Sequence, residues 1–174
     1  PTTPNRPSTQ VVKNPISTLV TEGEGQYDSM FPGENYPEML DMEIRTELVE
    51  FQKEKLKDGR ASGAVGTHQF LYPERVADLA GLPADAKFTP ENQERMFMAT
   101  LLNKPGREAI ADFLRGNSTD VETAIDQMSM EFASIEYRNG ESYYKDGVNK
   151  AKITRDRVRE ALIATRDELM RGNQ

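Results

Sequence analysis

Apolar residues return every three or four positions in several stretches of the chain, which predicts amphipathic helices. In one of them Val121, Ile125, Met128 and Phe132 share a helical face behind a capping box at residues 119–122, with Thr119 as the expected cap. Similar patterns predict helices over residues 42–58, 73–80 and 106–115, another after Thr89, and a last one after Thr154. The methionines in these patterns suit the irregular contacts of a helical core.

Two stretches interrupt the helical pattern with turn-forming residues. Residues 23–39 contain three glycines, two prolines and two tyrosines, with a short hairpin expected around Pro32 and Gly33. Residues 59–72 combine three glycines with a polar tip, and residues 137–149 also resemble a loop. We therefore expect an α+β fold that is mainly α, with a small β or irregular lobe near residues 23–45.

A short helix near the start of the chain ends on a carboxylate, that of Glu22. Asn14 is a good N-cap, Pro15 suits the first helical turn, and Gly23 favours the left-handed turn that closes a helix. Its apolar face is made by Ile16, Leu19 and Val20. Docked on a core, this helix would hold Glu22 at the wall of a cleft as a general acid. The competing interpretation is an ordinary surface glutamate, because perturbed catalytic carboxylates are a minority.

The composition suits one domain of ordinary size, because 174 residues with 36% hydrophobic residues suffice for a single core. Residues 1–13 are rich in proline and polar residues and form an expected arm or linker, which leaves residues 14–174 as the domain. Without cysteine and with His68 as the lone histidine, thiolate and multi-histidine metal sites are excluded. We expect no metal and no cofactor.

The charge pattern argues against nucleic acid as a partner. The net charge is −7, divided into about +3 over residues 137–174 and −10 over the remainder. A nucleic-acid-binding protein needs a dense basic face to release counterions. We find no membrane-spanning run and no basic-then-apolar leader, so we expect a soluble protein made in a cytoplasm.

Several motifs occur in an order that resembles the bacteriophage lambda endolysin family. They lie at residues 22–23, 27–36, 63–70, 88–93 and 124–135, so that the resemblance covers nearly the whole chain from about residue 14 to 170. It implies a lysozyme-like fold that cleaves the β-1,4 bond between N-acetylmuramic acid and N-acetylglucosamine, with the catalytic glutamate at the position of Glu22. The expected partner is a peptidoglycan glycan strand, bound by a monomeric domain, and no nucleic acid.

The chain departs from the family's usual Gly-Arg-Tyr-Gln, because Thr67 and His68 stand between Gly66 and Gln69. The glutamine is kept, whereas the shape of the sugar subsites is put in doubt. We expect Gln69, which can donate and accept hydrogen bonds, to contact sugar amides, and His68 to lie in the same subsite. Further substrate contacts are expected from Tyr27, Tyr143 and Tyr144.

The expected chemistry is protonation of a glycosidic oxygen, which requires a carboxylic acid whose pKa burial and a helix C-terminus have raised. Glu24 is the rival acid. A hydrolase also needs a second carboxylate, for which Asp28 and Glu34 are the candidates. The lambda family does without one, since the C6 hydroxyl of the substrate's own muramic acid attacks instead. We therefore expect a lytic transglycosylase, with the hydrolase as the alternative.

Two other functions are also compatible with the sequence. A lysozyme-like module could hold glycan without cutting it, as a binding or virion structural domain. An unrelated helical adaptor would use only the amphipathic helices. If the chain is an endolysin of phage or prophage origin, the lack of a leader implies release through a holin pore or delivery within a larger virion protein.

Overall fold

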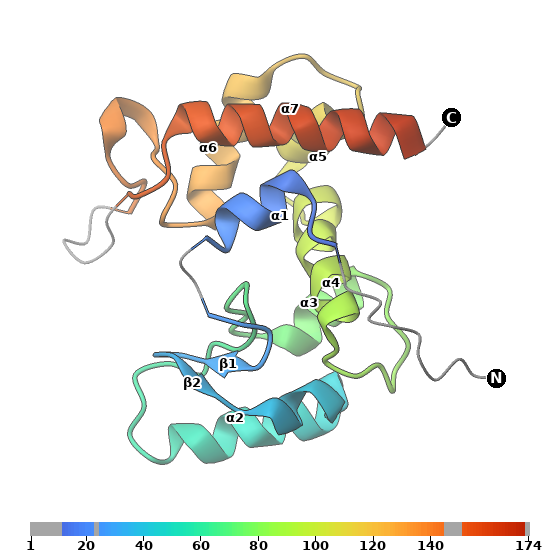
Figure 1. Cartoon of the computed structure of the whole chain (residues 1–174), viewed down its shortest axis with the longest axis vertical. Helices are drawn as coiled ribbons and strands as arrows, with labels where there is room; N and C mark the ends of the chain where they lie inside the picture. Colours follow the sequence, from blue (N-terminus) through green and yellow to red (C-terminus); the bar gives the residue numbers. More distant parts are fainter. Residues whose placement is uncertain (1–11, 23–24, 145–150, 173–174) are drawn as a thin grey trace.

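The computed structural model describes residues 12–22, 25–144 and 151–172, and it is mainly helical with a small two-stranded sheet (Figure 1). The α-helices are α1 (Pro15–Val20), α2 (Val49–Leu56), α3 (Pro73–Leu79), α4 (Pro90–Asn103), α5 (Glu108–Leu114), α6 (Val121–Glu131) and α7 (Arg155–Gly172). A π-helical turn spans Ile44–Leu48, 3₁₀ segments span Pro37–Asp41 and Arg138–Gly140, and the strands are β1 (Ser29–Met30) and β2 (Glu34–Asn35). The predicted class, α+β and mainly α, is confirmed.

Helix α1 packs along α7, at one side of the molecule, while β1, β2 and α2 lie at the other (Figure 1). The apolar face predicted for α1 is buried: Ile16, Leu19 and Val20 are all in the core. The backbone N–H of Ile16 also donates to Thr165 Oγ1 of α7, at 3.1 Å. These contacts fix the direction in which the end of α1 points.

The helix caps follow the sequence with one exception. Asn14 Oδ1 accepts from the N–H of Ser17, and Thr89 Oγ1 accepts from the N–H of Asn92, as predicted. The predicted cap of α6 is wrong by one residue, because Asp120 and not Thr119 accepts the hydrogen bond from the N–H of Thr123. A carboxylate is the better acceptor at this positive helix end, and both residue types are good caps.

The helix predicted over residues 42–58 begins with the π-helical turn Ile44–Leu48 before α2. A π turn adds a residue to the helical repeat and so rotates the following face. Leu56, which continues the helical apolar spacing of Ile44 and Leu48, is exposed. Gln52 instead is buried and donates to the carbonyls of Gly63 and Leu71 at 2.7 and 3.2 Å. The rotation thus points an amide at the ends of the glycine-rich loop.

The hairpin predicted around Pro32 and Gly33 is present, with Met30 pairing antiparallel to Glu34. The β lobe extends further than residues 23–45, because Met30 also bridges to Val65, and Val65 to Phe70. The glycine-rich stretch is therefore part of this lobe. In the described residues no helix is long and apolar enough to cross a membrane. Gly23, Glu24, residues 145–149 and most of the predicted arm lie outside the described residues.

Candidate functional site

A groove of about 730 Å³ lies between the β lobe and the end of α6. We call it the main groove. It is lined by Val20, Phe31, Ser62, Ala64, Thr67, His68, Gln69, Leu71, Glu131, Phe132, Ala133, Ser134 and Lys152. These residues come from α1, the hairpin, the glycine-rich loop, the end of α6 and the segment before α7. Segments far apart in the sequence therefore meet at one surface depression.

A second depression of about 510 Å³, which we call the side cavity, adjoins the main groove. The two share His68, Gln69, Leu71, Glu131 and Phe132. The side cavity then continues between α3 and α4, where it is lined by Phe70, Tyr72, Arg75, Val76, Leu79, Phe97, Thr100 and Lys104. A ligand in the main groove can thus place a branch in the side cavity.

The glycine-rich loop between the two depressions has a defined backbone. Gly66 has a φ of +82°, and a Cβ there would lie 2.5 Å from Gln93 Oε1 and 2.9 Å from Phe88 Cζ. Only glycine fits this turn without displacing buried groups. Val65 and Phe70 then exchange backbone hydrogen bonds of 3.0 and 2.8 Å, which close the loop.

Gln69 lies at the tip of this loop and lines both depressions. Its φ of 56° lies in the left-handed region that non-glycine residues seldom adopt, and its Nε2 donates to the carbonyl of Gly66 at 2.7 Å. Non-glycine residues in this region cost roughly 1 to 3 kcal/mol and concentrate at functional sites. The structure therefore presents the amide that we predicted as a sugar contact on a strained backbone at the groove.

Glu22 follows Val20, a lining residue of the main groove, by two positions at the end of α1. Its side chain is 54% exposed and accepts hydrogen bonds from both guanidinium nitrogens of Arg157 on α7, at 3.1 and 2.6 Å. The hydrogen bonds from Arg157 lower the pKa of the Glu22 carboxyl below its usual value. The raised pKa expected for an acid is thus wrong for this state, because Arg157 and solvent surround the carboxylate in place of apolar side chains.

Neither of the two predicted second carboxylates is among the residues that line the main groove. Glu34 accepts from the Tyr36 hydroxyl and from Arg60, both at 2.6 Å, and these hydrogen bonds lower its pKa. Asp28 lines a pocket of about 390 Å³ that shares Thr67 with the main groove. The structure does not bring either carboxylate into the set of groove residues that includes Gln69.

Tyr27 and His68 belong to a buried polar cluster that we call the inner network, together with Ser17 and Glu94. The Tyr27 hydroxyl donates to Glu94 Oε2 at 2.7 Å, and burial, followed by this carboxylate, raises the pKa of Tyr27. Ser17 Oγ donates to Glu94 Oε1 at 2.6 Å and lies 2.9 Å from His68 Nε2. Because the serine hydroxyl has one hydrogen, His68 Nε2 must be the donor of that second bond.

The His68 side chain is only 1% exposed and stacks on Phe97 with ring centroids 4.3 Å apart. Burial lowers the pKa of its imidazole to about 3, so the ring is neutral at ordinary pH. His68 therefore contributes to the groove mainly as a wall whose position Ser17 and Phe97 fix. Tyr27 points its hydroxyl into the same network.

Tyr143 and Tyr144 are 41% and 40% exposed and pack edge to face with each other, and Tyr143 packs in the same way on Tyr137. The Tyr144 hydroxyl donates to the carbonyl of Met130, at the end of α6, next to groove residues Glu131 and Phe132. Neither tyrosine is among the residues that line the main groove, but both rings stay partly open to solvent. Partly exposed rings are suited to stacking on a sugar.

Several charged residues, in the groove or paired with Glu22, were not predicted from the sequence. Glu131 lines both depressions and pairs with Lys104 and Arg107 at 2.7 and 3.0 Å. Lys152 lines the main groove, and Arg157 holds Glu22. The basic excess after residue 137 was the one available signal for Lys152 and Arg157. No sequence signal marked Glu131, because a glutamate at the end of a helix is ordinary.

Among the described residues, no group of three or more His, Cys, Asp or Glu side chains is placed to hold a metal ion. Comparisons with known protein families, curated proteins and solved structures find no match to this chain.

Proposed function

We propose that this protein is a lysozyme-like enzyme that cleaves peptidoglycan glycan strands as a lytic transglycosylase, with Glu22 as acid and base. The observation that carries the proposal is the main groove, which is lined by Val20 of α1, two positions before Glu22, and by the strained Gln69 loop. The order of motifs shared with the lambda endolysin family supports the same function and a phage or prophage origin. An adaptor made only of packed helices would have no use for this groove.

The ion pair with Arg157 leaves Glu22 ionised in the free protein, whereas cleavage begins with a protonated acid. Both partners are about half exposed, and exposed ion pairs contribute little to stability. A glycan that fills the groove would displace water and separate Arg157 from the carboxylate, which raises the pKa of Glu22. The proposal therefore requires that substrate binding prepare the acid.

The proposed reaction balances without an added nucleophile. Glu22 gives its proton to the glycosidic oxygen as the bond from C1 of the muramic acid breaks, and the departing N-acetylglucosamine gains a free 4-hydroxyl. The C6 hydroxyl of the same muramic acid forms the new bond to C1, and its proton goes to the Glu22 carboxylate. An intramolecular hydroxyl has a high effective concentration and outcompetes water.

The support for this route over the hydrolytic alternative is that neither Asp28 nor Glu34 is among the residues that line the main groove. A hydrolase holds its second carboxyl about 5 to 9.5 Å from the acid, across the bond that is cut. Glu34 is held by Arg60 and Tyr36, and Asp28 lines a different pocket. Glu131 lines the groove and is the carboxylate to mutate first if the products prove hydrolytic.

The deciding experiment digests purified cell wall and identifies the released muropeptides by mass spectrometry. We expect 1,6-anhydromuramic ends from the wild type and at least a roughly hundredfold lower rate from Glu22→Gln. Glu168→Gln, which removes the same charge from an exposed position of α7, should cut at the wild-type rate. Equal cutting by Glu22→Gln would overturn the assignment of the acid, and reducing muramic ends with ¹⁸O from labelled water would indicate a hydrolase.

A second candidate is a module that binds glycan without cutting it, and the lowered pKa of Glu22 is the observation that favours it. The Arg157→Gln variant separates the two. For an enzyme, loss of the Arg157 hydrogen bonds should raise the pKa of Glu22 and so shift the upper pH limit of the cutting rate, at which the acid loses its proton, upward. Retained wall binding by the wild type, with no new sugar ends after long digestion at any pH, would establish the binding module instead.

A further inference from the structure

The side cavity differs in chemistry from the main groove. Its walls are mostly apolar where it passes between α3 and α4, with Val76, Leu79 and Phe97 joined by Leu71 and Phe132. A glycan strand presents mostly hydroxyl and amide groups, which such walls cannot satisfy. The cavity therefore suits a ligand with aliphatic side chains better than a further sugar ring.

The cavity also carries an arginine that has no ion-pair partner among the described residues. Lys104, by contrast, donates to both Glu131 oxygens at 2.7 and 2.9 Å, a carboxylate that it shares with Arg107. Arg75 is exposed, and its guanidinium lies over the Tyr72 ring at 4.3 Å. Within the described ranges no carboxylate lies within ion-pair distance of Arg75. An arginine held flat by an aromatic ring presents its outer N–H groups to an incoming carboxylate.

We propose that the side cavity binds the acidic stem peptide of peptidoglycan, with a peptide carboxylate on Arg75 and aliphatic side chains against Val76, Leu79 and Phe97. This inference rests on the proposed function, because the stem peptide branches from the muramic acid of the strand that would occupy the main groove. The shared lining residues are His68, Gln69 and Leu71 from the glycine-rich loop and Glu131 and Phe132 from the end of α6, and they provide the passage for that branch. A volume of about 510 Å³ accommodates a few residues.

The kinetic test compares intact glycan strands with strands from which an amidase has removed the peptides. For Arg75→Gln we expect the KM on peptide-bearing strands to rise about tenfold, as for loss of a charge-assisted hydrogen bond, with kcat little changed. The KM on peptide-free strands should stay at the wild-type value. Arg171→Gln removes the same charge from the far pocket around Gly116 and should change neither KM. An equal rise of KM on both substrates would overturn the inference.

A binding test keeps the inference separate from the enzyme activity. The free stem tetrapeptide, titrated calorimetrically into the full chain, should bind wild type and Arg171→Gln but at least about tenfold more weakly to Arg75→Gln. Hexanoate, a carboxylate with a plain hydrocarbon body, should bind far more weakly than the peptide, and equal affinity would overturn the peptide assignment. If the wild type cuts no strand yet binds the tetrapeptide through Arg75, the proposed cleavage fails and the peptide site stands. If the wild type cuts strands but binds no tetrapeptide, the peptide site fails and the proposed cleavage stands.

Discussion

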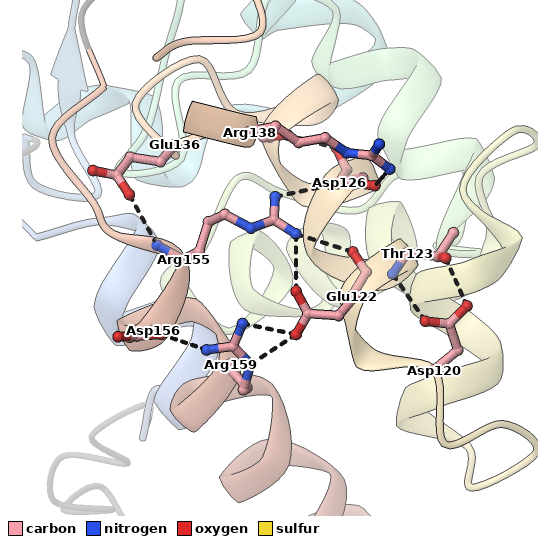
Figure 2. A network of polar contacts seen from close by, with 10 residues as sticks. Asp120, Glu122, Thr123, Asp126, Glu136, Arg138, Arg155, Asp156 and Arg159 are labelled. Carbon is pink, nitrogen blue, oxygen red and sulfur yellow. Dashed lines mark hydrogen bonds and ion pairs between the residues drawn. The ribbon is translucent and has the colours of Figure 1, made fainter. Parts of the chain in front are cut away.

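Two polar networks hold this fold together, and they are built in opposite ways. The inner network joins α1, the β lobe and α4 through one carboxylate, that of Glu94, which receives hydrogen bonds from the Ser17 and Tyr27 hydroxyls. The outer network joins α6 to α7 through several ion pairs, in which Arg155 and Arg159 both reach Glu122 (Figure 2). In the first network neutral hydroxyl groups donate to a carboxylate that is 13% exposed, and in the second network arginines donate to carboxylates that range from 8% to 56% exposed.

The surroundings of the outer carboxylates vary with depth. Glu122 is open to solvent, and hydrogen bonds from Arg159 and Arg155 lower its pKa. Asp126 is 8% exposed; burial alone would raise its pKa, but hydrogen bonds from Arg138 and Arg155 outweigh burial and lower it (Figure 2). Asp126, the most buried carboxylate of this network, thus has two cationic partners. One of them, Arg155, also pairs with the solvent-exposed Glu122.

The contribution of a hydrogen bond to stability depends on what replaces it when it is lost. A surface carboxylate that loses an arginine regains water, whereas a buried carboxylate that loses a hydroxyl donor stays unsatisfied. We therefore expect substitutions in the inner network to cost far more stability. These substitutions should also disturb the main groove, because His68 belongs to the inner network and lines the groove.

The largest effect is expected for Ser17→Ala, because this hydroxyl serves Glu94 and His68 at once. Its loss leaves two buried polar atoms unsatisfied and should lower the free energy of unfolding by roughly 3 kcal/mol. Urea unfolding followed by circular dichroism measures this. Thr18→Ala, at the neighbouring exposed position of α1, is the matched control, and equal losses in the two variants would break the comparison.

The next effect concerns pH. The folded pKa of His68, lowered by burial and then by Lys13 to about 3, lies below the ordinary value of 6.5. The unfolded chain therefore takes up a proton that the folded chain refuses, so stability is full above pH 6.5 and falls as the pH drops toward 3. Between pH 7 and 5 this linkage should cost about 2 kcal/mol.

His68→Gln cannot titrate in this range, so its unfolding free energy should stay nearly flat between pH 7 and 5, whatever its absolute stability. The measurement is a series of urea unfolding curves for both proteins. An equally steep decline of the unfolding free energy in the variant would show that groups other than His68 cause the pH dependence.

A smaller loss is expected for Tyr27→Phe, which removes one of the two hydroxyl donors to Glu94 and keeps the ring. The carboxylate retains Ser17, so the cost should be about 1.5 kcal/mol. The same unfolding assay measures it. Tyr72→Phe, whose ring is exposed, should unfold like the wild type. A Tyr27→Phe variant as stable as the wild type would show that water replaces the hydroxyl.

The smallest effect is expected in the outer network. Arg159→Gln removes the hydrogen bonds of 2.9 and 2.7 Å to Glu122, but Arg155 remains and water reaches the site. The loss should be at most about 0.5 kcal/mol and should shrink further in 1 M salt, where charges are screened. Unfolding at low and high salt measures both. A loss of several kcal/mol that persists in salt would mean that the two networks do not differ as described.

Much of the helical framework followed from the sequence alone. The caps at Asn14 and Thr89, the buried face of α1, and the hairpin at Pro32 and Gly33 are local features, set by side-chain hydrogen bonding, apolar spacing and turn chemistry within a few residues. The sequence also singled out Gln69 and Glu22 as chemistry worth examining. The local rules erred where the backbone departs from an ideal helix, as at the π turn that exposes Leu56 and buries Gln52.

Tertiary structure alone decided what surrounds each of those side chains. Arg157 is 135 positions from Glu22, and Glu94 is 67 positions from Tyr27, so no local pattern could pair them. The direction of a pKa shift depends on such partners and on burial, both of which arise only when distant segments pack. The sequence therefore determined which groups are present and which helices carry them, and packing decided that Glu22 is ionised, that His68 is neutral, and that Arg75 is left to face the side cavity.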